Sequence, residues 1–181
     1  MRVITGTAKG RRLLQPSGRD IRPTTERVKE AIFSALQFDI EGRRILDLFA
    51  GSGQLSCEAL SRGAQSATLV DNSESSLKIA RTNIENCGFI EKAKIVKSDY
   101  STFCSMCRDR FDIAFLDPPY HEGFLISAIK CVQPLMSDYG IIVCEHPKDL
   151  LLEQKIGDLY VSRQYHYGKI NITVYKKGDN A

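Results

Sequence analysis

Short apolar runs alternate with stretches of helical periodicity along most of this chain. Ser73 is a candidate N-cap, Leu77, Ala80 and Ile84 then recur at helical spacing, and Gly88 stands where a helix would stop. Apolar runs of strand length lie at 44–48, 67–71, 93–99, 111–116 and 140–144, and helical patterns at 25–38, 54–62, 73–87 and 124–133. This alternation predicts an α/β protein with a mostly parallel sheet.

The two ends of the chain depart from this alternation. Segments 159–161 and 170–175 have no clear helical pattern between them, and Gly168-Lys169 can form a turn, so we expect a closing antiparallel hairpin. Residues 1–22 predict a basic β-hairpin extension around Lys9 and Gly10, followed by one compact domain, 23–181. The expected apolar face of the 25–38 helix is formed by Val28, Ile32, Ala35 and Leu36.

An aspartate ends each of four successive predicted strands. These are Asp47, Asp71, Asp99 and Asp117. One such acid is usually a solvated strand end or a helix cap. Four of them predict a binding site, because ligands in open α/β sheets bind at the carboxyl ends of the strands.

A glycine turn follows the first of these strands. Gly51 and Gly53 allow the backbone to turn tightly and to approach a ligand. Ser56 takes the place of the third glycine of a dinucleotide fingerprint, which disfavours NAD or FAD. Asp47 with this turn instead resembles motif I of S-adenosylmethionine-dependent methyltransferases, in which the acid lies beside the amino-acid end of the cofactor. Asp71, eighteen residues after Gly53, is then the expected ribose ligand, near the roughly 20-residue offset of such acids.

In the same families a residue at the position of Asp99 lies near the adenine amino group. Thus Asp99 is the expected adenine ligand. We extend the predicted cofactor contacts to Phe49, Asn72 and Tyr100, which stand beside these acids in the sequence.

The tetrad Asp117-Pro118-Pro119-Tyr120 follows the fourth strand and looks like the catalytic motif of amino-methyltransferases. An exocyclic amine of a base is a weak nucleophile because its lone pair is conjugated with the ring. The Asp117 carboxylate and the Pro118 carbonyl, fixed by two consecutive prolines, can each accept one of its N–H groups. Tyr120 can stack on the base, an interaction worth roughly 1–3 kcal/mol. The alternative is an ordinary rigid turn.

The net charge of +3 is unevenly distributed. Residues 1–44 hold ten Lys and Arg against five acids, whereas the remainder is slightly acidic. A basic extension on an acidic domain is suited to phosphate contacts, and we expect Lys9, Arg11 and Arg12 to contact nucleic acid. The alternative is a solvated charged face.

Composition restricts the remaining classes. The 181-residue chain has 43% hydrophobic residues, no signal-peptide pattern and no run of about 18 apolar residues, so we expect a cytosolic protein without membrane contact. Cys104 and Cys107 have C-x-x-C spacing but no second pair, and the six cysteines are expected to be reduced thiols rather than metal ligands. His121 is the histidine nearest the tetrad, and a solvated position is its expected environment.

Blocks along almost the whole chain resemble the RsmD family, whose members methylate the exocyclic N2 of a guanine in small-subunit ribosomal RNA. The resemblance implies a Rossmann-like class I methyltransferase fold with a seven-stranded sheet, S-adenosylmethionine as cofactor, and 16S ribosomal RNA or the small subunit as partner, with the enzyme a monomer. The matching blocks are 2–6, 9–13, 22–30, 46–53, 58–64 and 117–120.

The resemblance also implies roles for the segment that precedes the first helix. In the family this segment lies near the cofactor and substrate cleft, so Arg22 is expected to contact RNA and Thr24 the cofactor. Helix capping by Thr24 is the alternative. The chain departs from the family at 54–57, where larger residues replace a small, glycine-containing stretch, and at 71–73.

Two other functions stay open at this point. The same tetrad occurs in enzymes that methylate adenine N6 or cytosine N4 of DNA or RNA, although no domain for reading a DNA groove is evident. A catalytically silent RNA-binding module is the third reading, against which the intact Asp117 and glycine turn argue.

Overall fold

The computed structural model describes residues 1–16, 26–119 and 124–178. Its helices are α1 Glu26–Ala35, α2 Gln54–Ser61, α3 Glu74–Asn86, α4 Tyr100–Met106 and α5 Phe124–Val132, with 3₁₀ turns at Ile90–Lys92 and Gln133–Leu135. Its strands are β1 Arg44–Asp47, β2 Ser66–Asp71, β3 Ala93–Lys97, β4 Phe111–Leu116, β5 Met136–Pro147, β6 Lys155–Ile156, β7 Leu159–Tyr167 and β8 Ile170–Lys177.

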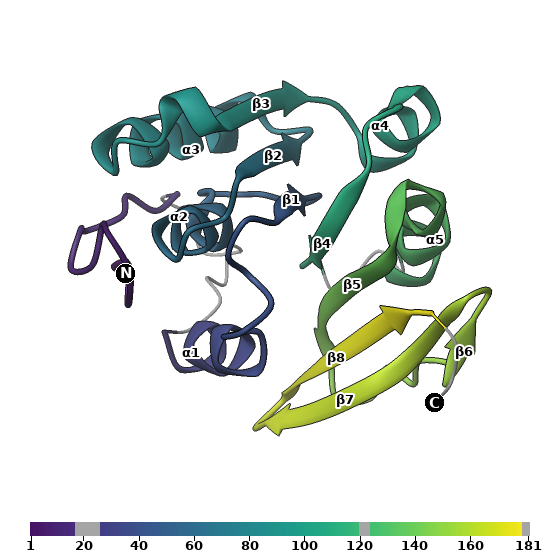
Figure 1. Ribbon diagram of the computed structural model, residues 1–181. Helices are drawn as coiled ribbons and strands as arrows, with labels where there is room; N and C mark the ends of the chain where they lie inside the picture. Colours follow the sequence, from purple (N-terminus) through teal and green to yellow (C-terminus); the bar gives the residue numbers. More distant parts are fainter. Residues whose placement is uncertain (17–25, 120–123, 179–181) are drawn as a thin grey trace.

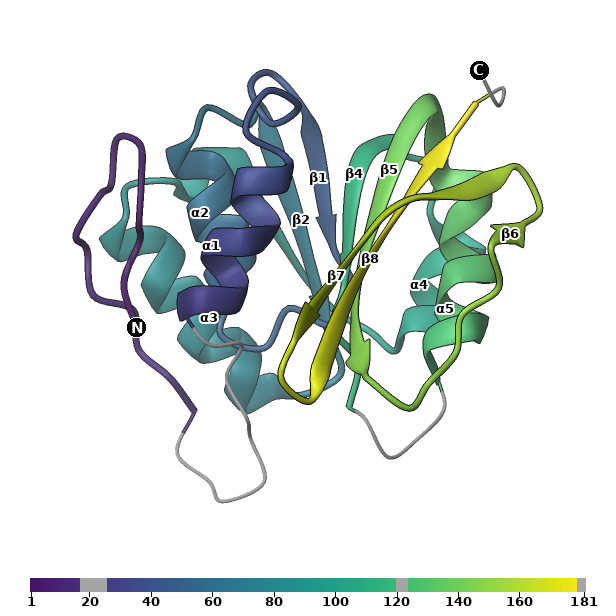
Figure 2. The ribbon, with the colours of Figure 1, turned by 90° about the horizontal axis from the view of Figure 1, so that it is seen from below.

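The strands form one sheet in the order β3-β2-β1-β4-β5-β8-β7-β6. The first five are parallel, and β8 and β7 are antiparallel, which confirms the α/β fold and the closing hairpin. Helices α1, α2 and α3 cover one face, and α4 and α5 cover the other (Figures 1 and 2). The chain order reverses between β1 and β4, so the carboxyl ends of these strands border the crevice where open α/β sheets bind ligands.

Several boundaries differ from the sequence prediction. The sheet has eight described strands rather than seven, because the two-residue β6 pairs with the start of β7. Helix α1 ends at Ala35 and not at residue 38, because the chain turns at once to bury Leu36 and Ile40 while Phe38 stays exposed. The helix α4, for which no expectation was made, begins directly after Asp99.

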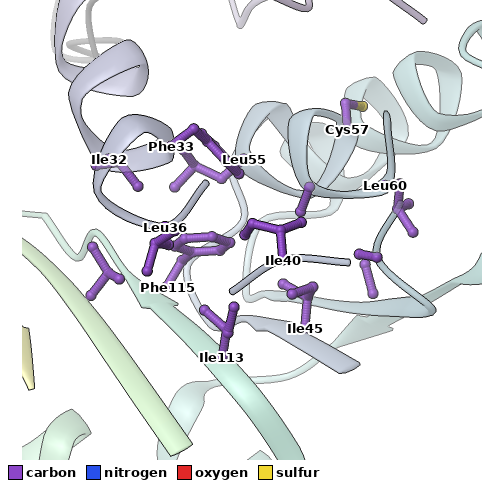
Figure 3. Packing of buried hydrophobic residues seen from close by; sticks show 14 of the residues in the cluster. Ile32, Phe33, Leu36, Ile40, Ile45, Leu55, Cys57, Leu60, Ile113 and Phe115 are labelled. Atoms are coloured by element: carbon purple, nitrogen blue, oxygen red, sulfur yellow. The ribbon is translucent and has the colours of Figure 1, made fainter. Parts of the chain in front are cut away.

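The core has one apolar layer on each side of the sheet. On the side of α1 and α2, side chains from both helices meet those of β1 and β4 (Figure 3). Phe33, which lay outside the predicted apolar face of α1, is fully buried, and its ring lies 5.6 Å from that of Phe115. The labelled residues of this layer are Ile32, Phe33, Leu36, Ile40, Ile45, Leu55, Cys57, Leu60, Ile113 and Phe115.

The amino-terminal extension doubles back on itself and has, within residues 1–16, a single β-bridge, between Arg2 and Arg12. It lies against α2 and α3 through buried polar groups. Glu58 of α2 accepts bonds from the backbone N–H of Ile4 (2.8 Å) and Thr5 (3.0 Å), and Lys29 Nζ lies 3.4 Å from the Glu58 carboxylate. Both charged side chains are fully buried. The extension is thus an integral layer of the domain over the part that the structure describes.

The expected end of the extension, at residue 22, lies outside the described residues. None of the helices in the described ranges is long and apolar enough to cross a membrane. Of the six cysteines, all free thiols, Cys57 and Cys144 are buried and the others half-buried.

Candidate active site

Three aspartates lie together at the carboxyl edge of the sheet, on neighbouring strands. Asp47 ends β1 and is in register with Leu69 of β2 and Phe115 of β4. Asp71 and Asp117 therefore each lie two residues, about 7 Å, further along the flanking strands. The three carboxylates border the switch point between β1 and β4, with Asp47 between Asp71 on one flanking strand and Asp117 on the other.

Asp47 forms the buried floor of this site. Its side chain is 3% exposed, and its carboxylate accepts a 2.7 Å hydrogen bond from Ser56 Oγ. Burial penalises the charged form and raises the pKa of Asp47 to about 6, although the bond from Ser56 opposes this shift. A buried carboxylate in this condition is stabilised by a cationic ligand, so Asp47 is suited to the positively charged end of a cofactor.

The glycine turn is held in shape by Asp71. Gly51 N–H donates to one carboxylate oxygen and Ser73 N–H to the other, each at 2.8 Å. Gly51 has a φ of 52° and open space where a Cβ would lie. Gly53 has a φ of 70°, and a Cβ there would meet Leu69 at 2.8 Å. The turn therefore requires glycine for close packing on one side and leaves its backbone accessible on the other.

Helix α2 starts at this turn without a side-chain cap, since Gly53 is its N-cap residue. Its first N–H groups and the partial positive charge of the helix end face the carboxyl edge. An anionic group is stabilised at such a position. With Asp47 beside it, the turn can bind a zwitterionic group, the amino-acid end of a cofactor.

Asp99 caps α4, and an aromatic group lies beside it. Asp99 accepts a 2.6 Å hydrogen bond from the Ser101 hydroxyl and further bonds from the backbone N–H of Ser101 and Thr102, and these bonds hold its pKa well below the usual range. The Tyr100 ring lies 5.6 Å from Phe49 and 5.7 Å from Phe124. All three rings keep some exposed surface, so they form an apolar wall suited to a flat ring such as adenine.

Asp117 and Pro118 extend directly from the last residue of β4. Asp117 is half-buried, Pro118 is buried and Pro119 is exposed. A small hollow of about 20 Å³ lies beside the prolines and is lined by the end of β5 and the start of α5. The rigid dipeptide is thereby held between two strands and a helix, with Asp117 at the crevice.

Four residues singled out in the sequence have no described position. Arg22, Thr24, Tyr120 and His121 lie outside the described residues, and their expected roles stay predictions. Asn72 is exposed at the turn after β2, next to Asp71.

The Lys9 loop of the extension lies away from this edge. The backbone N–H of Ala8 contacts Ser61 Oγ at the last residue of α2, whereas the glycine turn precedes the first. The loop with Lys9 is therefore displaced from the glycine turn by the length of α2, about 12 Å. Figure 2 shows this loop and the carboxyl ends of the strands at opposite ends of the molecule. Arg11 and Arg12 are exposed on its returning arm.

Three contributing residues were missed from the sequence. Ser56 was read only as a missing glycine, but it orders Asp47. Phe124 has the spacing of a helix core residue, which hid its contact with Tyr100. Asn83 is fully buried; its Nδ2 donates to Ser52 O in the glycine turn (2.8 Å) and to Leu14 O (3.0 Å), and its Oδ1 accepts from Leu14 N (2.7 Å).

Sheet order, glycine turn and strand-end carboxylates define the class: the chain has the fold of the S-adenosylmethionine-dependent methyltransferases. Solved structures agree. A putative methyltransferase from Escherichia coli, yhhF, superposes with a TM-score of 0.89 at 30% identity, covering 99% of each chain. A putative methylase from Haemophilus influenzae gives a TM-score of 0.82 at 26% identity, covering 98% of each chain.

The chain belongs to the family described as Conserved hypothetical protein 95, whose model matches residues 1–176. It is 36% identical to the putative rRNA methyltransferase YlbH of Bacillus subtilis, over 98% of this chain and 99% of that protein. It is 30% identical to ribosomal RNA small subunit methyltransferase D of Escherichia coli strain K12, over 98% of this chain and 90% of that protein. The resemblance to the RsmD family is confirmed.

Proposed function

We propose that this protein transfers a methyl group from S-adenosylmethionine to the exocyclic N2 of a guanine in 16S ribosomal RNA, on an assembling small subunit. The observation that carries the proposal is the juxtaposition at the switch point of Asp47, beside the glycine turn, with Asp117 and Pro118 on the adjacent strand. A cationic methyl donor and a base amine would meet across that boundary.

The cofactor fits the residues on the β1 and β2 side. Its ammonium would lie near Asp47, its carboxylate at the uncapped start of α2, and its ribose hydroxyls at Asp71. Its adenine would lie against the aromatic wall, with Asp99 at the rim. When bound, S-adenosylmethionine supplies an electrophilic methyl group on a sulfonium.

The target amine is positioned by the chain's own acceptors. Asp117 would accept one N–H of the amine and the carbonyl of Pro118 the other, which directs the nitrogen lone pair towards the methyl donor. Asp117 need not remove a proton beforehand, because the amine becomes acidic only once it is methylated. The carboxylate can then accept that proton. Such a base has to leave its stack to reach the edge.

The choice of RNA rests on the relatives and on the size of the chain. Relatives that align over 98% and 82% of its length carry the name of small-subunit ribosomal RNA methyltransferases. One compact domain with a short extension offers little surface to select a nucleotide unaided, which favours a ribonucleoprotein substrate. A DNA amino-methyltransferase would need elements that read a groove.

The test is incubation of the protein with methyl-labelled S-adenosylmethionine and unmodified small subunits, with naked 16S ribosomal RNA and DNA in parallel, followed by nucleoside analysis. Label in N2-methylguanosine is the expected result. Label in methyladenine or methylcytosine would contradict the guanine assignment, and absence of label from every substrate would favour a binding module.

Asp117→Asn separates chemistry from folding in the same assay. We expect transfer to fall by at least about 100-fold, while S-adenosylhomocysteine binding, measured by calorimetry, is retained. The matched control is Asp109→Asn, because Asp109 precedes the same strand at its other end and its ion pair with Lys94 is exposed. Full activity of Asp117→Asn would refute its role.

A further inference from the structure

A basic surface lies on the catalytic edge, on the opposite side of Asp117 from the cofactor residues. It consists of Lys148, directly after β5, and Lys169, in the turn between β7 and β8. The backbone N–H of Lys148 donates to the carbonyl of Lys169 at 3.0 Å, so the two segments are fixed side by side. We call this pair the edge lysines.

The edge lysines are accessible and border a depression. Both are exposed, and with Asp149 and Gly168 they line an open hollow of about 570 Å³. Within the described ranges neither makes an ion pair with a carboxylate. Asp149 supplies one opposing charge, which leaves the rim with a net charge of +1.

The edge lysines are adjacent to the tetrad. Pro147 lines the small hollow beside Pro118 and Pro119, and Lys148 is the next residue, about 3.8 Å along the chain. The ends of β4 and β5 and the β7–β8 turn lie at the same end of the molecule (Figure 2). A nucleotide whose base reaches Asp117 thus brings its neighbouring phosphates close to these lysines.

The neighbouring turn residues favour a single strand over a duplex. His166 is exposed and Tyr167 is half-buried, immediately before Gly168 and Lys169. Aromatic rings interleaved with basic side chains are typical of surfaces that bind unstacked nucleotides. The loop carrying Lys9, by contrast, is at the far end of α2, about 12 Å from the glycine turn.

We infer that Lys148 and Lys169 bind the phosphates that flank the target nucleotide and hold the RNA strand across the catalytic edge. The inference rests on the proposed function, since it takes Asp117 as the position of the target base. Neutralising two phosphates of a single strand contributes about 1.4 to the slope of log affinity against log salt. With this slope, the two lysines increase the affinity for RNA about 25-fold at 0.1 M salt relative to 1 M.

The test compares two double variants that remove equal charge from the carboxy-terminal sheet. Lys148→Gln with Lys169→Gln removes the edge lysines, and Lys155→Gln with Lys176→Gln removes two exposed lysines that both pair with Tyr160 at the other end of the sheet. Affinity for unmodified 16S ribosomal RNA is measured between 0.05 and 0.2 M salt, values chosen to span the range of strong dependence.

We expect the edge variant to lose about 25-fold in affinity at 0.1 M salt, with a slope shallower by about 1.4, and the control variant to stay near wild type. Asp149→Asn should tighten binding. S-adenosylhomocysteine affinity should be the same in all proteins, which shows that the fold is intact.

Equal losses in both double variants, or an unchanged slope in the edge variant, would overturn the inference while wild-type methylation still supported the proposed function. Wild-type protein that binds S-adenosylhomocysteine but labels no RNA would instead count against the proposed function itself.

Discussion

Asn83→Leu should destabilise the protein by about 3 kcal/mol, although the change conserves volume. Asn83 makes three hydrogen bonds to backbone groups: Leu14 N, Leu14 O and Ser52 O. Within the described residues these groups have no other hydrogen-bond partner. Each bond contributes about 1 kcal/mol net, and a buried backbone group left without one costs about 1–3 kcal/mol. Water can reach Leu14 once the extension lifts, so the lower value per group applies. For a chain of this size the loss corresponds to about 6–12 °C in Tm.

Urea unfolding followed by circular dichroism measures this loss directly. The matched control is Thr82→Ala, because Thr82 is half-buried and its hydroxyl makes a surface hydrogen bond to Lys78 O within the same helix. This control should change stability by no more than about 0.5 kcal/mol. Asn83→Asp should be at least as damaging as Asn83→Leu, because a carboxylate would face the two carbonyl oxygens. A loss below about 1 kcal/mol in Asn83→Leu would refute the reasoning.

The remaining predictions concern the buried charges and the glycine turn. Because burial raises the pKa of Asp47 from 3.8 to about 6, the folded protein holds a proton that the unfolded chain releases, and this part of the stability is full below about pH 4 and lost as pH rises through 6. As the pH rises from 4 to 7.5, the free energy of unfolding of Asp47→Asn, measured in urea, should therefore rise by up to about 3 kcal/mol relative to that of wild type. A difference between the two proteins that does not change with pH would contradict this. Asp71→Asn should lower S-adenosylhomocysteine affinity at least about tenfold and cost about 1 kcal/mol of stability, since only one bond to the carboxylate, from Gly51 N–H or from Ser73 N–H, is lost. An unchanged affinity in calorimetry would show that Asp71 does not bind the cofactor. Lys29→Met should cost about 1–3 kcal/mol, because the buried Glu58 carboxylate loses its lysine but keeps Arg62 Nε at 2.9 Å, and an unchanged stability in thermal unfolding would contradict this.

The sequence was sufficient to predict the parts of this molecule that obey a local rule. Helix α3 starts after Ser73, whose side chain accepts from Ser76 N. The strands β1 and β2 end at the predicted acids, whereas β3 and β4 end two residues and one residue before theirs. Apolar periodicity and capping act within a few residues, so the printed chain contains them in full. The closing hairpin was predictable for the same reason, from Gly168 and its flanking apolar runs.

What the sequence did not reveal depends on contacts between distant segments. Lys29, Glu58 and Asn83 look like solvent-facing helix residues, and they are buried because backbone atoms of the extension complete their hydrogen bonds. Backbone groups are the same in nearly every residue, so no sequence pattern shows which of them will bind a buried side chain. The strand β6 was missed because two residues are too few to show the alternation of apolar and polar side chains that marks a strand. The position of the Lys9 loop depends on how the extension packs along α2.

The docking of the extension affects how the protein folds during its synthesis on the ribosome. The extension precedes its partners along the chain, since Glu58 lies 54 residues after Ile4 and Asn83 lies 69 residues after Leu14. At about 5–20 residues per second, Leu14 waits roughly 3–14 s for the residue that binds it. During that interval the apolar side chains of Val3, Ala8 and Leu13, which are buried in the finished protein, have nothing to cover them. The extension is thus synthesised before the two helices that bind it, and its docking is among the last steps in the folding of this domain.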